Sequence, residues 1–385
     1  MYKTKQLFFV ACIGLLLFGI GLITLGSIAT GLKEKFQLTD LATGTLFSIL
    51  PIGILTGSLV FGPLCDRYGY KTFLVLSCLC LFAGFQGIAW SSSLTLLKIS
   101  IYFFGLAGGA INGATNAAVA DTSTANKGAA LSLLGVSFSI GAFGFPFVLA
   151  ALEERFPFDQ ILTVVSLLAL ASAVLVAVTK FPPPKQTTRI PFHKNLAFFK
   201  DGVLLLIAFF LFCQSSFEGI INNWTTTYLQ QQANISQNNA LYALSLYVAG
   251  MGVMRLLNGT VLRSLPNRTL LYLSFALMLA GTLFLKAHTS FPIAATGLIL
   301  LGAGLAAGFP VMLGIVGNRY PSLSGTAFSF VLVVALLGNM MVNYLVGIIA
   351  QRAGIQHLTT VALVEITIMI LLTIPILQKT SLSYQ

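Results

Sequence analysis

Residues 62–71 of the chain read Gly62-Pro63-Leu64-Cys65-Asp66-Arg67-Tyr68-Gly69-Tyr70-Lys71. This polar stretch separates two apolar segments, near residues 42–64 and 72–90. Each segment is close to the roughly twenty residues that cross a bilayer core. Asp66 falls at the end of the first segment, where a carboxylate can pair with a base or face the positive N-terminus of another helix. The stretch therefore predicts two membrane helices joined by a charged connection.

The rest of the chain repeats this alternation of apolar segments and short connections. Of its 385 residues, 57% are hydrophobic and 8% are charged, and its mean hydropathy is +0.92. A soluble domain needs far more charge to cover its surface, so the composition indicates an all-α membrane protein. Apolar windows predict twelve transmembrane helices, near residues 7–31, 42–64, 72–90, 94–120, 128–152, 160–179, 202–230, 239–262, 268–286, 292–317, 325–350 and 358–377.

The most polar internal connection divides these spans into two sets of six. It predicts an N-terminal six-helix bundle over residues 1–179, a cytoplasmic linker over residues 180–201 and a C-terminal six-helix bundle over residues 202–385. The two halves share a glycine pattern at a fixed offset of 197 residues, as in the pair Gly53 and Gly250. An even number of spans in each half makes this a parallel repeat.

Basic residues set the expected orientation. With both termini inside, fourteen Lys and Arg residues fall in cytoplasmic connections and five fall outside. This bias predicts a multi-pass plasma membrane protein, of the bacterial inner membrane type, with cytoplasmic termini. The net charge of +11 is scattered between the spans, so nucleic acid is not an expected partner. The expected partners are the lipid bilayer, a small-molecule substrate and a coupling ion, and the chain is expected to be a monomer.

Residues suited to metal binding or catalysis are sparse. The five cysteines show no metal-ligand spacing, and the three histidines all fall in connections. The sequence therefore predicts no metal, no cofactor and no enzyme activity.

Residues 62–71 resemble the signature loop of the major facilitator superfamily, G-x-L-x-D-R-x-G-x-K, with Tyr70 where the family often has a basic residue. The resemblance implies the major facilitator fold, in which two pseudo-symmetric six-helix bundles expose a central cavity alternately to either side. It agrees with the twelve spans and the repeat.

The same resemblance implies a latch that closes the cytoplasmic side. In that latch Asp66 meets the start of span eleven, near residues 324–325, Arg67 pairs with Asp121, and Lys71 completes the basic end of the loop. The alternative is a loop that only fixes topology.

Span four is rich in glycine and carries Asn112 and Asn116 one helical turn apart. Glycines at three- and four-residue spacing let helix backbones approach closely in lipid. The two amides lie on one face of the helix. They either hold the bundle together or form part of a polar substrate site.

Span seven carries Glu218 near its middle. A carboxylate inside the membrane is costly and is by default a functional hypothesis. Because desolvation disfavours its charged form, such a group can load and release a proton as a cavity changes sides. Glu218 is therefore the candidate for ion coupling, and the alternative is a structural acid neutralised by a base such as Arg255.

Polar and aromatic side chains surround Glu218 in the sequence. Amides can bond to hydroxyl groups, and aromatic faces can stack on the apolar face of a sugar ring. The predicted substrate residues in this span are Gln214, Asn222, Asn223, Trp224 and Tyr228.

A glutamate six residues before Trp224, and a glycine-rich span four that ends in Asn116, resemble the sugar-transporting branch of the superfamily. This branch contains the fucose–proton and glucose symporter-like proteins. The fucose symporters have a carboxylate one turn before the span-four asparagine, and that position is Asn112 here. The first span also lacks an acid, so Glu218 is the remaining well-placed coupling group.

Four further polar residues within spans have open roles. Arg255 is structural, part of an inner gate, or the partner of Glu218. Asn339 and Asn343 repeat the one-turn amide pair and either line the cavity or pack. Glu365, in the peripheral last span, has a packing role or faces the lipid.

The sequence thus predicts a secondary active transporter. Its predicted activity is proton- or sodium-coupled uptake of a monosaccharide or a similar polyhydroxylated solute. The alternative is proton-driven efflux of an amphipathic drug-like compound, which would need an aromatic cavity, and the chain has 31 Phe residues. A nutrient sensor or lipid scramblase is a third possibility, although such proteins often carry long soluble extensions.

Overall fold

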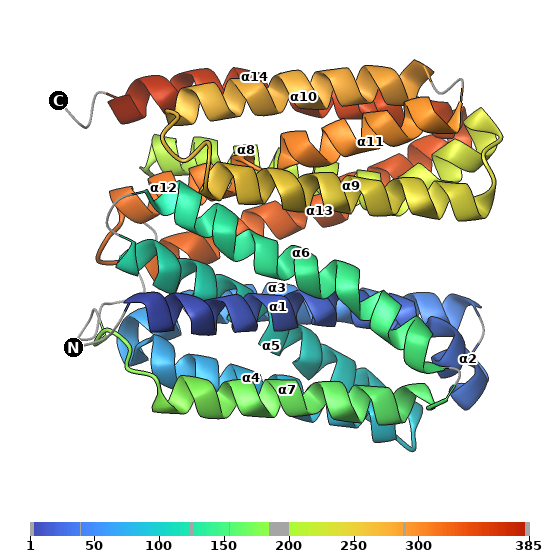
Figure 1. Cartoon of the computed structure of the whole chain (residues 1–385), viewed down its shortest axis with the longest axis vertical. Coiled ribbons are helices and arrows are strands. Elements are labelled where there is room, and N and C mark those ends of the chain that lie inside the picture. Colours follow the sequence, from blue (N-terminus) through green and yellow to red (C-terminus); the bar gives the residue numbers. More distant parts are fainter. Residues whose placement is uncertain are drawn as a thin grey trace. The chain divides into compact units, whose positions relative to one another are not determined.

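A computed structural model describes residues 4–38, 40–123, 126–153, 155–184, 200–287 and 290–381 of the chain. Every regular element within these residues is a helix, and the helices of each half lie alongside one another (Figure 1). The predicted all-α architecture is confirmed.

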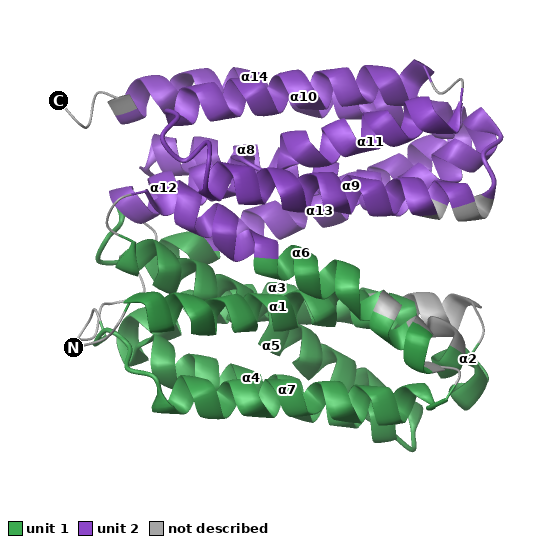
Figure 2. Cartoon of the chain, in the orientation of Figure 1, with its two compact units in different colours: residues 1–124, 137–190, 320–329 green, residues 125–136, 191–319, 330–385 purple. Residues whose placement is uncertain are grey.

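The chain divides into two compact units, coloured green and purple in Figure 2. Unit 1 comprises Met1–Thr124, Ser137–Ile190 and Tyr320–Ser329, and unit 2 comprises Ala125–Val136, Pro191–Arg319 and Phe330–Gln385. Each unit therefore includes one short segment from the opposite half of the sequence. The division into bundles at residues 180–201 remains a prediction, and residues 185–199 lie outside the described part of the chain.

Close glycine contacts hold the helices of unit 1 together. The unit contains α1 (Thr4–Ser27), α2 (Ala29–Phe36), α3 (Asp40–Tyr68), α4 (Tyr70–Trp90), α5 (Leu94–Thr122), most of α6 (Lys127–Glu153) and α7 (Phe158–Val178). A Cβ atom on Gly105 of α5 would lie 3.2 Å from Cα of Gly53 in α3. Small residues at such points give the close backbone approach that stabilises helix pairs in lipid.

Unit 2 repeats these contacts in its own helices. It contains α8 (Gly202–Ala233), α9 (Gln237–Gly259), α10 (Asn267–Ala287), α11 (Phe291–Leu305), α12 (Gly308–Arg319), most of α13 (Ser324–Ala353), the 3-10 turn η2 (Ile355–His357) and α14 (Leu358–Ser381). The carbonyl oxygen of Tyr102 leaves no room for a Cβ atom on Gly53. The carbonyl oxygen of Ile299 does the same for Gly250, and both residues of this second pair lie 197 positions after those of the first. The predicted internal repeat is therefore present in the packing.

Eleven helical segments among the described residues are long and apolar enough to cross a membrane. The twelfth predicted span corresponds to α9, whose 23 residues include Arg255 and Asn258. The count of twelve is thus supported approximately.

The tenth span differs from the single helix expected over residues 292–317. It breaks at residues 306–307, between α11 and α12. Pro310 has no N–H to donate to the carbonyl of Ala306, so the helical ladder loses a bond at this point. Gln214 of α8 donates its side-chain N–H to the carbonyl of Leu305 at 3.0 Å and so satisfies one of the freed groups.

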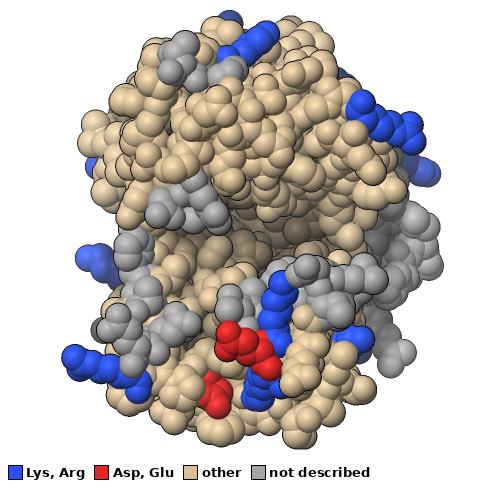
Figure 3. Space-filling model, turned by 90° about the vertical axis from the view of Figure 1, so that its right-hand side faces the viewer, with Lys and Arg blue, Asp and Glu red and all other residues tan. Residues whose placement is uncertain are grey.

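The surface of the molecule is mostly uncharged. On the face shown in Figure 3, Lys, Arg, Asp and Glu form a few separate groups in a broad uncharged area.

Candidate functional site

Asp66, at the end of α3, contacts the N-terminus of α13 within unit 1. Its carboxylate accepts hydrogen bonds from the backbone N–H of Gly325 at 3.3 Å and of Thr326 at 2.8 Å. The Thr326 hydroxyl donates a third bond at 2.6 Å. Asp66 is only 2% exposed, and the positive end of the helix dipole compensates the buried charge. This is the position predicted for the residue from the loop signature.

The second acid of unit 1, Asp121, has partners different from the predicted one. It accepts a hydrogen bond from the Tyr70 hydroxyl at 2.5 Å and another from the Ser324 hydroxyl at 2.7 Å. The predicted pair of Arg67 with Asp121 is not formed among the described residues, and the Tyr70 hydroxyl contacts the carboxylate where a base was expected. The guanidinium of Arg67 instead lies 4.9 Å from the centre of the Tyr68 ring.

Both basic residues of the loop are exposed, since Lys71 and Arg67 face outward from the helix ends. A signal for the contact between Tyr70 and Asp121 was present in the sequence. Tyr70 is the one position that departs from the family signature, and a tyrosine hydroxyl can donate to a carboxylate where a base would form an ion pair.

The two asparagines of α5 bond to each other within unit 1. The Asn116 amide donates to the Asn112 carbonyl at 2.8 Å and to the Asn112 side-chain oxygen at 3.0 Å. Both side chains are half-buried. Their pairing fixes two amides on one face of the helix, as the one-turn spacing predicts.

Glu218 and Arg255 of unit 2 are close enough for their opposite charges to attract each other. The charges of α8 Glu218 and α9 Arg255 interact, and the buried Tyr247 lies within range of both. Arg255 also donates to the carbonyl of Gly135 at 3.2 Å. No hydrogen bond to the Glu218 carboxyl is present among the described residues, and this side chain is partly exposed. Glu218 thus has a charged neighbour on α9, and its side chain is not fully enclosed.

A row of amides joins α8 to α13. Asn339 donates to the carbonyl of Ser215 at 2.8 Å, and Asn343 donates to the Asn339 carbonyl at 2.8 Å. Asn223 donates to the Asn343 side-chain oxygen at 3.0 Å. We call Asn223, Asn339 and Asn343 the amide row. All three are part-exposed or exposed, so the row retains hydrogen-bonding capacity for another molecule.

Gly219 makes room for this row and was not predicted from the sequence. A Cβ atom on Gly219 would lie 2.5 Å from the side-chain nitrogens of both Asn339 and Asn343. Any other residue there would displace the amides. A glycine directly after an intramembrane acid was the available signal.

The remaining predicted substrate residues of α8 lie in different surroundings. Gln214 is buried and bonds to the break in the tenth span. Tyr228 is 1% exposed and donates to the carbonyl of Leu285 at 3.4 Å, which places it in the packing of unit 2. Trp224 is partly exposed and lies close to Gly347 of α13. Asn222 is also partly exposed, one turn after Glu218.

Glu365 of α14 packs against α8 within unit 2. It is 5% exposed, and its carboxyl contacts the hydroxyl of Ser216. The alternative that Glu365 faces the lipid is therefore wrong, because α14 turns this side chain toward α8. Its other carboxyl oxygen has no hydrogen-bond partner among the described residues.

Comparisons with known proteins come from sequence and from structure. Residues 11–338 match the model of the Major Facilitator Superfamily. The inner membrane transport protein YdiM of Escherichia coli (strain K12) is 21% identical over 369 residues, which cover 91% of this chain and 89% of YdiM.

Two solved structures share the fold. The proton:xylose symporter XylE, bound to 6-bromo-6-deoxy-D-glucose, gives a TM-score of 0.81 at 13% identity, covering 96% of this chain and 94% of that chain. A structure of the E. coli fucose:proton symporter FucP gives a TM-score of 0.78 at 16% identity, covering 95% and 97%.

Proposed function

The chain belongs to the Major Facilitator Superfamily, and from this premise we propose that it takes up a monosaccharide or a similar polyhydroxylated solute. Membership establishes a multi-pass membrane transporter rather than an enzyme. The proposed uptake is driven by a proton or sodium gradient and proceeds by alternating access.

The amide row beside Glu218 is the observation that carries this proposal. Asn223, Asn339 and Asn343 are fixed by mutual hydrogen bonds, and Gly219 leaves space for them. A fixed series of amides offers alternating donors and acceptors, which is the pattern that sugar hydroxyl groups need. Asn222 and Trp224 on the same helix supply a further amide and an aromatic face.

Two asparagines of unit 1 are proposed as further substrate-binding residues. Asn112 and Asn116 present two paired, half-buried amides on α5. The structurally similar XylE and FucP are described as proton-coupled sugar symporters, which supports a sugar as the substrate class.

Glu218 is the proposed coupling residue. Its charged form is favoured by Arg255 and disfavoured by desolvation, so opening or closing the adjacent space changes the balance between the two forms. Proton uptake from one side and release to the other would then accompany substrate movement. Arg255 donates a hydrogen bond to the Gly135 carbonyl, and we propose that this bond keeps its charge near Glu218.

The carboxylates of unit 1 are proposed as the gate. Asp66 and Asp121 bind the first turn of α13 through backbone and hydroxyl donors. Breaking these bonds would release that turn and open one side. Arg67 and Lys71, both exposed, would contribute charge at this end rather than a direct bond.

Transport by purified protein in liposomes tests the substrate. We expect a labelled neutral monosaccharide to accumulate when an inward proton or sodium gradient is imposed, and Asn343→Ala to reduce this uptake strongly. Asn239→Ala, an exposed asparagine at the start of α9, is the matched control. If a hydrophobic cation binds and monosaccharides have no effect, the proposal of sugar uptake is wrong, and efflux of an amphipathic compound takes its place.

The orientation and assembly are part of the proposal. The proposed form is a monomer in the bacterial inner membrane, and the fourteen-to-five charge count supports an orientation with both termini and the linker inside. A cysteine at position 190 should react with an impermeant maleimide only after the cells are permeabilised. Strong labelling of intact cells would show that the proposed orientation is wrong.

A further inference from the structure

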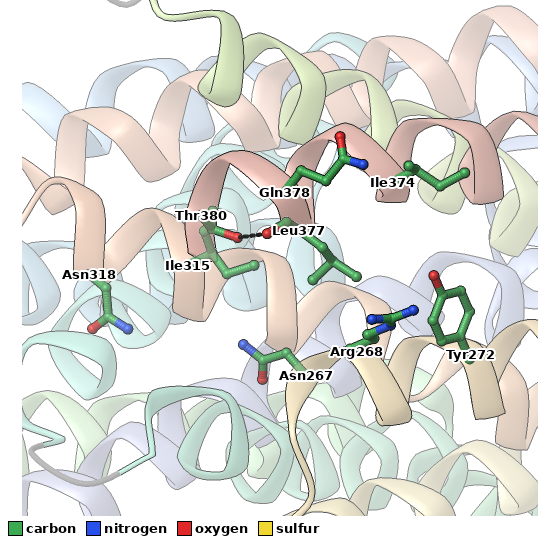
Figure 4. Close-up of a pocket in the computed structure, with 9 residues that line it drawn as sticks. All are labelled: Asn267, Arg268, Tyr272, Ile315, Asn318, Ile374, Leu377, Gln378 and Thr380. Atoms are coloured by element: carbon green, nitrogen blue, oxygen red, sulfur yellow. Dashed lines mark hydrogen bonds between the residues drawn. The ribbon is translucent and has the colours of Figure 1, made fainter. Parts of the chain in front are cut away.

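A groove of about 420 Å³ opens at one end of unit 2, between α10, α12 and α14 (Figure 4). Its polar wall includes Asn267 and Arg268 from the first turn of α10, and its apolar wall includes Tyr272, Ile374 and Leu377. In the close-up the Arg268 guanidinium lies between Leu377 of α14 and the ring of Tyr272. The groove belongs to neither the amide row nor the carboxylates of unit 1.

The charge of the groove is positive. The guanidinium of Arg268 lies 5.5 Å from the centre of the Tyr272 ring, which holds it over an aromatic face. No Asp or Glu is among the described residues that line the groove. The first turn of α10 adds the unsatisfied N–H groups of a long helix to the same wall. A negatively charged group is therefore the complementary ligand.

The apolar wall continues along α14 as a stripe. Ile374 is 43% exposed, and Leu371, Ile368 and Val364 follow it at three- and four-residue intervals with 61%, 39% and 54% of their surface exposed. This spacing sets the four side chains on one face of the helix. Ten residues of helix extend about 15 Å, a length that suits one acyl chain.

We propose that this groove binds the headgroup of an anionic glycerophospholipid. The phosphate is bound by Arg268 with the amide of Asn267, and one acyl chain follows the stripe on α14. A free phosphate or phosphate ester would use the polar wall alone and leave the stripe empty. The orientation assigned from the basic residues puts the groove at the cytoplasmic surface, where anionic lipids attract basic groups.

Lipid binding to the purified full-length chain in a neutral detergent tests this. We expect phosphatidylglycerol to raise the unfolding temperature and to give lipid-bound species in native mass spectrometry, and phosphatidylcholine to do neither at equal concentration. Arg268→Gln should weaken phosphatidylglycerol binding about fivefold, the effect of one basic residue near an anionic surface. Arg268→Lys should retain most of it.

Two controls separate the possible sources of the effect. Arg352→Gln removes an exposed arginine of α13 outside the groove and should leave binding unchanged. Inorganic phosphate and glycerol 3-phosphate should stabilise the protein far less than the lipid does. Equal stabilisation by these soluble anions, or equal loss of binding in the Arg352 and Arg268 variants, would overturn the proposal.

Discussion

Two carboxyl groups in unit 1 and two in unit 2 have opposite surroundings. In unit 1 Asp66 and Asp121 lie at helix ends, where backbone N–H groups and hydroxyls donate hydrogen bonds to them. In unit 2 Glu218 and Glu365 lie within long helices, and the described residues supply one hydroxyl contact to Glu365 and no hydrogen bond to Glu218. Donors stabilise a fixed charge, and their scarcity makes a buried charge costly.

The difference separates two uses of an acid in the membrane. A carboxylate with several fixed donors can hold a helix end in place. A carboxyl with few donors can change its proton when its surroundings change. We therefore expect substitutions in unit 1 to alter conformation and substitutions at Glu218 to alter coupling.

Glu218→Gln should have the largest effect. It removes the ionisable group while it keeps the shape, so uphill accumulation should be abolished and substrate exchange should persist in part. Uptake and counterflow in liposomes measure the two activities separately. A variant that still concentrates substrate would shift coupling to Glu365.

Asp66→Asn should come next, because it changes conformation rather than coupling. Losing hydrogen bonds to a charged group is worth about 1.5–3 kcal/mol, enough to shift a two-state equilibrium tenfold or more. Transport should slow and the protein should move toward the inward-open state, with little change in folding. Cysteine accessibility from each side measures this.

Arg67→Gln is the matched control for Asp66, since Arg67 is exposed and has no bond to Asp121. Its accessibility pattern should change far less than that of Asp66→Asn, because Arg67 contributes charge at this end of the unit and no direct bond. An effect of Arg67→Gln as large as that of Asp66→Asn would restore the ion pair that the structure replaces with Tyr70.

Trp224→Ala should have a smaller effect, confined to substrate affinity. Loss of a stacking face is worth about 1–2 kcal/mol, or roughly a tenfold weakening. Tyr228→Phe is the control, because Tyr228 is buried in unit 2 and its ring is kept. Equilibrium binding of a labelled sugar should distinguish the two, and equal affinities in both variants would remove Trp224 from the site.

Glu365→Gln should have the smallest effect of the four. Its contact with Ser216 can be kept by an amide, so we expect a change of about 1 kcal/mol in the free energy of unfolding. Uphill accumulation should remain. If Glu365→Gln abolishes uphill accumulation and Glu218→Gln does not, Glu365 rather than Glu218 is the coupling residue.

Most of the fold was predictable because the membrane sets strong rules. Span length and the repeat follow from apolar windows and glycine spacing. The place of Asp66 was predictable from the loop signature. The break at residues 306–307 was missed because α11 and α12 together are uniformly apolar, and only Pro310 indicates it.

Side-chain partners were harder to predict because they depend on helix rotation. The chain offered Arg67 and Tyr70 within four residues as partners of Asp121, and charge alone favoured the wrong one. Glu365 was assigned to the periphery from its place in the order of spans, although its helix turns it toward Ser216. Sequence spacing identifies the face of a helix but not which neighbour that face meets.

The segment Tyr320–Ser329, which completes unit 1, has a consequence for how the protein is made. Asp66 and Thr326 are separated by 260 residues, and a ribosome adds roughly 5–20 residues per second. Asp66 therefore waits roughly 10–50 s after its own synthesis before the turn of α13 that binds it leaves the ribosome. Unit 1 is therefore translated first but completed only when the start of α13 has been synthesised. Until then Asp66, at the end of α3, lacks the donors of Gly325 and Thr326.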